Sequence, residues 1–246
     1  EKIAMLQGRS EAERLYRKVY KVLDFVAIRE PISQLVMQDI GIDSTLSFDC
    51  VPLYIRDHYH NPKKQVKDKV VIAGSVAFTT AGVEQLARYI AELQHRGFTV
   101  ELLMGAKAFP AADDTLFVDL LQSYFAKKLP VVVATSMEEW LDTINHATFF
   151  VSGRFHHSIA AFCVNTPFIA LNSNTPKVHS ICAFLGQSEP LLFTDPNLFI
   201  KLLERTAALA VDSCDNCAKI EEICRLAEKN FQGLKQLLAA TAAAAS

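Results

Sequence analysis

The sequence predicts an α/β fold, in which a parallel sheet carries helices on both of its faces. From residue 70 onwards, short apolar runs alternate with longer segments that have the apolar periodicity of helices. Alternation of this kind is typical of parallel sheets that are covered on both sides. Half of the 246 residues are hydrophobic, so the chain can bury a substantial core. At this length we expect one large domain or two small ones.

Residues 1–60 predict the end of an amino-terminal α/β unit. Residues 2–24 have helical periodicity, and the short apolar run that follows them predicts a strand over 25–28. Pro31 suits the first turn of a helix that continues to about residue 39. Residues 45–54 predict a further strand. So few elements rarely form an independent domain, so we expect this domain to be incomplete and the chain to be a fragment.

Residues 68–195 predict a complete Rossmann-like domain. A polar segment over residues 56–69 separates it from the first unit. Its helices are expected to begin at Thr79 or Thr80, at Asp113–Asp114 and at Ser136, because threonine, aspartate and serine commonly cap helices. Its strands are expected at residues 70–76, 98–105, 131–135, 147–153, 166–171 and 190–193. The last segment, 196–246, predicts carboxy-terminal helices and an alanine-rich tail.

Composition argues against several classes of partner. The formal charge is −2 and the longest basic runs are pairs of lysines, which argues against a nucleic-acid ligand. No apolar run approaches the roughly 18 residues of a membrane span, so we expect no transmembrane segment. The six scattered cysteines are typical of reduced thiols and favour a cytoplasmic location. Cys214 and Cys217 have the C-x-x-C spacing without a matching second pair. We therefore expect no metal ion and no cofactor.

The strongest functional signal lies between residues 149 and 171. A buried strand ends in Ser152 and Gly153, and the turn that follows carries Arg154 and His156 at the start of a helix. Ligands of open α/β sheets bind at the carboxyl ends of strands, and the first amides of a helix favour anions. Arg154 could hold a carboxylate or phosphate through paired hydrogen bonds. His156 could transfer a proton near neutral pH, and Ser152 belongs to the same polar cluster.

Other interpretations of these residues remain open. Arg154 could instead cap backbone carbonyls, and His156 could be a half-buried histidine whose hydrogen bonds are satisfied. His157 is expected to point away from the site, toward solvent or the sheet. The loop after the next strand carries Lys177, which could reach the same anion or remain an ordinary exposed lysine.

At these residues the chain resembles the polysaccharide pyruvyl transferase family. The family's R-x-H turn before a helix corresponds to Arg154-Phe155-His156. A strand that follows a small residue and a proline corresponds to residues 166–171, and a lysine loop corresponds to Pro176-Lys177. The helix after that loop ends in Leu-Gly, here residues 185–186.

The resemblance extends into the amino-terminal part and spans about residues 15–190. Arg29 and Ser33 fall on the positions of the family's Arg-acidic-x-x-Ser segment, and Asp49 falls on an acidic position before the interdomain linker. The resemblance implies a glycosyltransferase-B-like pair of Rossmann domains with the site in the cleft between them. It also implies a role in polysaccharide biosynthesis.

The activity that the resemblance implies is transfer of pyruvate from phosphoenolpyruvate onto two sugar hydroxyls as a ketal. Arg154 and Arg29 would then bind the carboxylate and phosphate of the donor, and His156 would be the acid/base. The partners would be phosphoenolpyruvate and a glycan or nucleotide-linked sugar. Two arginines suit a donor with two anionic groups, and a histidine can move a proton between a sugar hydroxyl and the enol carbon.

Two alternatives belong to other functional classes. A glycosyltransferase that uses a nucleotide-sugar would also place its donor phosphates at a helix amino terminus. A catalytically inactive binding module would keep the fold for partner recognition, and the lack of the family's Gly-Asn-x-Gly-Asp loop favours it. A fold shared by all three cannot separate them, because function resides in the site.

Overall fold

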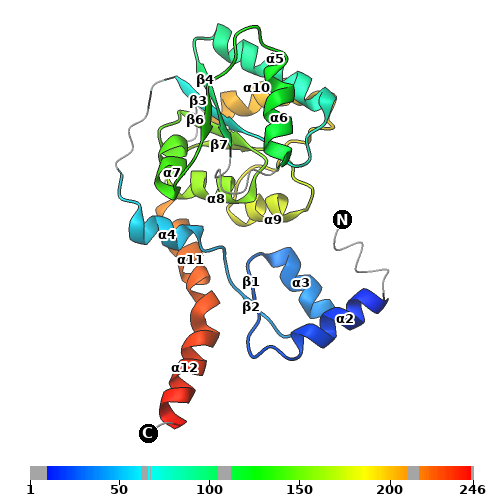
Figure 1. Ribbon diagram of the computed structural model, residues 1–246, viewed down its shortest axis with the longest axis vertical. Helices are drawn as coiled ribbons and strands as arrows, with labels where there is room; N and C mark the ends of the chain where they lie inside the picture. The colour runs from blue at the N-terminus through cyan, green and yellow to red at the C-terminus, as the bar shows by residue number, and fades with distance from the viewer. Residues whose placement is uncertain (1–9, 62–65, 67, 105–111, 210–215, 245–246) are drawn as a thin grey trace. The chain divides into compact units, whose positions relative to one another are not determined.

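The computed structural model describes residues 10–61, 66, 68–104, 112–209 and 216–244 (Figure 1). The chain divides into two compact units. The first unit comprises residues 1–57 and 217–246, and the second comprises residues 58–216. The predicted segment 196–246 is thus shared between the two units, and each unit is described here by itself.

The second unit contains a parallel sheet, as predicted, and this sheet has five strands. Its strands occur in the spatial order β5-β4-β3-β6-β7. Their bounds are β3 (Lys69–Ala73), β4 (Thr99–Met104), β5 (Val131–Val133), β6 (Phe149–Ser152) and β7 (Phe168–Ala170). Strand β3 is central, and its register pairs Ile72 with Leu102 on one side and with Val151 on the other.

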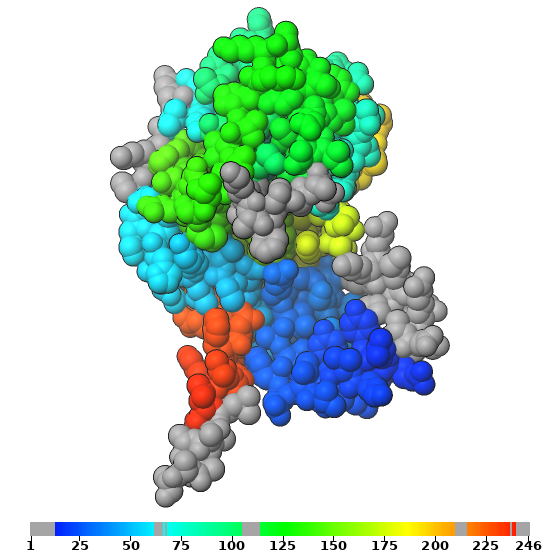
Figure 2. All heavy atoms as spheres, viewed as in Figure 1, coloured from blue at the N-terminus to red at the C-terminus, as the bar shows by residue number. Residues whose placement is uncertain are grey.

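Helices cover both faces of this sheet (Figure 1). One layer contains α5 (Thr80–His95), which contacts α6 (Ala112–Gln122) and α10 (Leu198–Leu209). The other layer contains α8 (Phe155–Cys163), which contacts α7 (Met137–Asn145) and α9 (Lys177–Phe184). In Figure 2, α6 and the segment after it (green) form a continuous outer surface of the second unit. The predicted α/β class with helices on both faces is confirmed.

The alternation of strand residues explains this layering. Val70, Ile72 and Val151 belong to the core cluster beneath α5 and α10, to which α5 contributes Leu86 and Ile90. The residues between them point to the opposite face, because successive strand side chains alternate. Two predicted caps are also present. Thr79 Oγ1 accepts the Gly82 N–H at 3.1 Å, and Ser136 Oγ accepts the Glu139 N–H at 3.0 Å.

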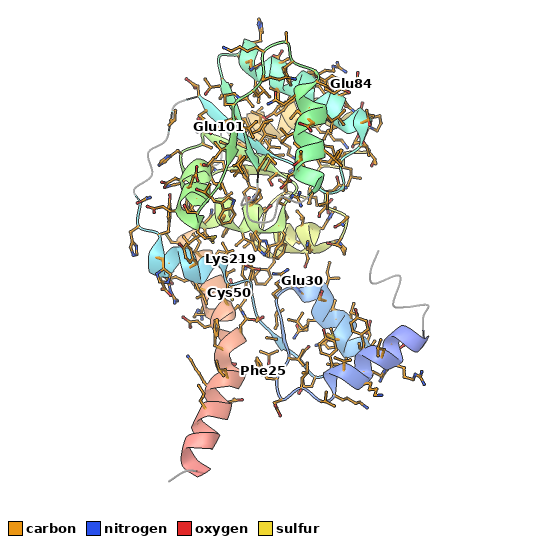
Figure 3. All side chains as sticks on the ribbon, viewed as in Figure 1. Phe25, Glu30, Cys50, Glu84, Glu101 and Lys219 are labelled. Atoms are coloured by element: carbon orange, nitrogen blue, oxygen red, sulfur yellow. The ribbon has the colours of Figure 1, made fainter. Side chains whose placement is uncertain are left out.

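The first unit is smaller. A two-stranded parallel sheet of β1 (Ala27–Ile28) and β2 (Thr45–Leu46) accompanies α2 (Ser10–Tyr20) and α3 (Pro31–Asp39). Glu30 accepts hydrogen bonds from the first amides of α3, at whose start it lies in Figure 3. The unit is completed by α4 (Val51–His58), α11 (Cys217–Glu228), a 3-10 turn (Lys229–Phe231) and α12 (Gln232–Ala244). Asn230 donates to the Phe48 carbonyl at 2.7 Å, which ties the end of α11 to the segment before α4.

Two predicted strands are wrong in whole or part. The strand expected over residues 45–54 ends at Leu46, and helix α4 begins at Val51. Asp49 Oδ1 accepts the Val51 N–H at 3.1 Å and Pro52 lies in the first turn, so the local sequence starts a helix. The strand expected over residues 190–193 is reduced to an isolated parallel bridge between Leu171 and Leu191. None of the described helices combines the length and apolarity needed to cross a membrane.

Candidate functional site

The strand order places a topological switch point between β3 and β6. From β3 the chain proceeds outward through β4 and β5, then returns past β3 to β6 and β7. Ligands of open parallel sheets bind beyond the carboxyl ends of the strands at such a point. Ser75 follows β3 there, Gly153 follows β6, and Asn172 follows β7.

Close packing joins these three strand ends. The Gly153 N–H donates to the Gly74 carbonyl at 3.2 Å, and the Ser75 hydroxyl donates to the Asn172 carbonyl. A Cβ at position 153 would lie 2.2 Å from Ser75 Cβ and 3.0 Å from the Asn172 oxygen. Any larger side chain at position 153 would clash with these atoms, so the position requires glycine. The backbone of the following turn is thereby held against β3 and β7.

Ser152 and His157 support this turn from inside. Ser152 is fully buried, its Oγ accepts the Arg154 N–H at 3.0 Å, and the same oxygen lies 3.2 Å from His157 Nδ1. The His157 ring lies buried against Trp140 and Phe150. Burial, together with positive charge on Arg154 and His156, lowers the pKa of His157 to about 3. His157 is therefore neutral near pH 7 and lies on the sheet side of α8.

Arg154 begins helix α8. It occupies the N-cap position with extended backbone, and its side chain makes no capping bond. Its guanidinium pairs through Nη2 with the carboxylate of Asp114 on α6. The Arg154 side chain is 23% exposed, and its Nε is buried without a hydrogen-bond partner among the described residues. Sequence reasoning used Asp114 as a helix start and missed this pairing.

His156 and Lys177 lie beside the same helix end. His156 is exposed, and its ring packs edge-on to Phe155 with the ring centroids 5.4 Å apart. Lys177 is the first residue of α9, and its Nζ lies 5.8 Å from the centroid of the Phe155 ring. The structure thus brings Arg154, His156 and Lys177 to the amino end of α8, where the helix dipole favours anions.

Arg29 belongs to the first unit and follows β1. Its Nη1 lies 2.7 Å from Asp49 Oδ2, and the Arg29 side chain is 47% exposed. Asp49 is buried and also holds the first turn of α4, so it fixes one end of the Arg29 guanidinium. Ser33 lies in α3, where its amide donates to Glu30 at 2.8 Å.

One cavity of the second unit lies apart from this site. A cavity of about 220 Å³, lined among others by Asn165, Pro167 and Arg205, lies at the amino-terminal edge of β7. Within the described ranges, no cluster of histidine, cysteine or acidic side chains could hold a metal ion. Cys214 of the C-x-x-C pair lies outside the described residues, and Cys217 begins α11.

Two solved structures share the fold. The UDP-GlcNAc 2-epimerase of Methanocaldococcus jannaschii, determined with UDP-GlcNAc and UDP, superposes with a TM-score of 0.55 at 12% identity. That match covers 77% of this chain and 55% of the epimerase. A glycosyltransferase from Rickettsia africae gives a TM-score of 0.51 at 14% identity and covers 94% of this chain and 66% of that protein. The chain thus spans less than two thirds of either structure, and the shared architecture is glycosyltransferase-B-like.

Comparison with families of known proteins is more specific. A search of the curated proteins finds no match. The sequence model of the polysaccharide pyruvyl transferase family matches residues 9–175, which is more than half of the chain and includes Arg29, Arg154 and His156. The chain therefore belongs to the polysaccharide pyruvyl transferase family.

Proposed function

We propose that the amino end of α8 binds phosphoenolpyruvate and that the protein transfers its pyruvyl group to a sugar as a ketal. Membership of the family supports this reaction class. The observation that carries the proposal is the position and hydrogen bonding of the Arg154 side chain. Its guanidinium is held at a helix amino terminus, at the carboxyl edge of the sheet, with a buried Nε–H that lacks a partner among the described residues.

An anionic ligand would satisfy this arrangement. An unsatisfied buried donor costs about 1–3 kcal/mol, and a ligand oxygen that accepts from Nε would recover that energy. Phosphoenolpyruvate has a carboxylate and a phosphate, so one group would bind Arg154 and the other would be near Lys177. The Lys177 ammonium and the α8 dipole both favour negative charge there.

His156 is the proposed acid/base. In the reaction, C3 of the enol accepts a proton and C2 is attacked by one sugar hydroxyl, which loses its proton. The bond from C2 to the phosphate oxygen then breaks and phosphate leaves, and a second hydroxyl attacks C2, closes the ketal and loses its proton to the departing phosphate. An exposed imidazole two residues after the anion-binding arginine suits the proton transfers. His157 does not suit them, because burial keeps it neutral and directs it to Ser152.

Two further residues have separate parts in the proposal. Arg29 is fixed by Asp49 within the first unit, and a role for its guanidinium in donor binding stays a prediction. Ser152 was expected to contact substrate, but its hydroxyl is enclosed and already bonded to the turn. We therefore assign Ser152 to holding the Arg154 backbone in place.

Ligand binding by the purified chain tests the donor assignment. Phosphoenolpyruvate is expected to raise the melting temperature of the wild-type chain, and Arg154→Ala is expected to abolish the rise. Arg96→Ala is the matched control, because Arg96 is an arginine of the same unit whose exposed side chain bonds to Glu92 of α5. A stabilisation that survives in Arg154→Ala would contradict the assignment.

A ligand panel separates the proposed function from its alternatives. UDP-GlcNAc, which the structurally similar epimerase binds, tests the nucleotide-sugar alternative. Stabilisation by UDP-GlcNAc and not by phosphoenolpyruvate would favour a glycosyltransferase. Stabilisation by neither would favour a binding module.

The His156 assignment needs a second assay. His156→Ala is expected to bind phosphoenolpyruvate like the wild type, yet to release phosphate from it at least about a hundredfold more slowly with a panel of sugar diols as acceptors. His179→Ala, on α9, serves as the histidine control. Full turnover by His156→Ala would refute the acid/base role.

A further inference from the structure

Asp114 occupies a position where the sequence of α6 would normally place an apolar residue. Asp114, Phe117 and Leu121 recur at intervals of three and four residues and therefore share one face of the helix. All three are buried, with exposed fractions of 9%, 1% and 0%. Phe117 packs edge-on to Phe78 and Phe193, which anchors this face of α6. A carboxylate on such a stripe is costly unless it is paired.

The partner of this carboxylate is the guanidinium of Arg154. Both side chains of the pair are mostly shielded from solvent, at 13% and 23% exposed. Asp114 engages Nη2 and leaves the Arg154 Nε–H without a partner among the described residues. An arginine side chain has about 2 kcal/mol of rotamer entropy, so an unanchored Arg154 would lose binding energy each time it is ordered by a ligand.

We propose that Asp114 is the positioning residue of the site: it holds the Arg154 guanidinium in the orientation that receives the donor anion. The inference rests on the proposed function, since Arg154 matters to binding only if it contacts the donor. Asp114 acts through Arg154 and does not itself touch substrate. The hydrogen bond that Asp114 accepts, rather than its negative charge, is the property the site uses.

This distinction gives opposite expectations for two substitutions. Asp114→Ala removes the hydrogen bond and frees the guanidinium. Asp114→Asn keeps an acceptor oxygen on a side chain of the same shape and removes a negative charge that repels the ligand. If Asp114 merely competed with the donor anion for Arg154, both substitutions would tighten binding.

The first measurement is the affinity of the full chain for phosphoenolpyruvate by calorimetry. Asp114→Ala is expected to weaken binding about tenfold or more, which corresponds to about 1.4 kcal/mol. Asp114→Asn is expected to bind at least as tightly as the wild type. Asp119→Ala, an exposed aspartate on the same helix, should be unchanged. Affinity in Asp114→Ala equal to or better than that of the wild type would overturn the proposal.

The second measurement needs no ligand. The Nε–H signal of Arg154 in a nitrogen-15 spectrum, assigned by its loss in Arg154→Lys, should have the relaxation of a rigid group in the wild type and Asp114→Asn. It should become mobile in Asp114→Ala. A signal equally rigid in Asp114→Ala would overturn the positioning role. If the wild-type chain fails to bind phosphoenolpyruvate in the calorimetry, the proposed function is refuted. The relaxation measurement still decides whether Asp114 holds the Arg154 guanidinium.

Discussion

Substitution of Gly153 by alanine tests whether the R-x-H turn depends on close packing of the strand ends. The new Cβ would lie 2.2 Å from Ser75 Cβ and 2.6 Å from Ser75 Oγ. Carbon atoms normally approach to about 3.5–4.0 Å, so an overlap of more than about 1 Å must be relieved. The Ser75 side chain cannot easily move aside, because Ser75 is buried and its hydroxyl is hydrogen-bonded to the Asn172 carbonyl and the Ala77 amide.

Overpacking of this severity costs about 3 kcal/mol. For a unit of this size the melting temperature should fall by roughly 6–12 °C. Trp140 is the single tryptophan of the chain and lies buried in α7, so its fluorescence during urea unfolding reports on the second unit. Because Arg154 follows the displaced residue, affinity for phosphoenolpyruvate should fall as well.

A compensating substitution makes this prediction specific. Ser75→Gly removes the atoms that clash, so Gly153→Ala should cost less in the Ser75→Gly background than in the wild type, with a coupling free energy above about 1 kcal/mol. Gly97→Ala is the control: nothing lies within 4 Å of its new Cβ, and its cost comes from a φ of +90°. Ser75→Gly should not reduce that cost. A loss of stability below about 0.5 kcal/mol in Gly153→Ala would refute the packing argument.

Two further predictions concern pH and the first unit. Because the folded pKa of His157 is depressed to about 3, the unfolded chain binds a proton that the folded chain does not, and stability should fall as pH drops below about 6.5. Between pH 6.5 and 5 this lowers the free energy of unfolding by about 1.6 kcal/mol, and His157→Gln should show a correspondingly smaller slope of unfolding free energy against pH. An identical slope would contradict the burial of a neutral imidazole. Asp49→Ala should destabilise the first unit by about 1–2 kcal/mol, because it loses both the α4 cap and the Arg29 pair, whereas Asp49→Asn keeps a cap acceptor and should cost less. Urea unfolding followed by circular dichroism measures both, and equal losses in the two Asp49 variants would contradict the capping role.

Much of the fold could be predicted because its local signals agree. The buried strands of the second unit are short apolar runs, and Thr79 and Ser136 mark helix starts that the structure confirms. The segment after Leu46 was misjudged because the apolar run from Val51 to Ile55 resembles a strand. Asp49 and Pro52 were the contrary signal, since a cap and a first-turn proline favour a helix.

The candidate site was only partly predictable. Arg154 and His156 could be singled out because they follow a buried strand, and Lys177 Nζ lies 5.8 Å from the centroid of the Phe155 ring. Ser75 was missed because it was included in the strand that ends at Ala73. Asp114 was missed because its pairing spans 40 residues of sequence, which no local pattern records. The available signal was its helical spacing from Phe117 and Leu121, which places Asp114 on the buried face of α6.

The central claim is that the amino end of α8 receives the donor anion, and a crystal structure of the chain soaked with phosphoenolpyruvate tests it most directly. We expect a carboxylate or phosphate oxygen within hydrogen-bonding distance of Arg154 Nε, with His156 close to C3 of the enol. Phosphoenolpyruvate bound elsewhere on the chain, with Arg154 Nε still lacking a ligand oxygen, would contradict the account.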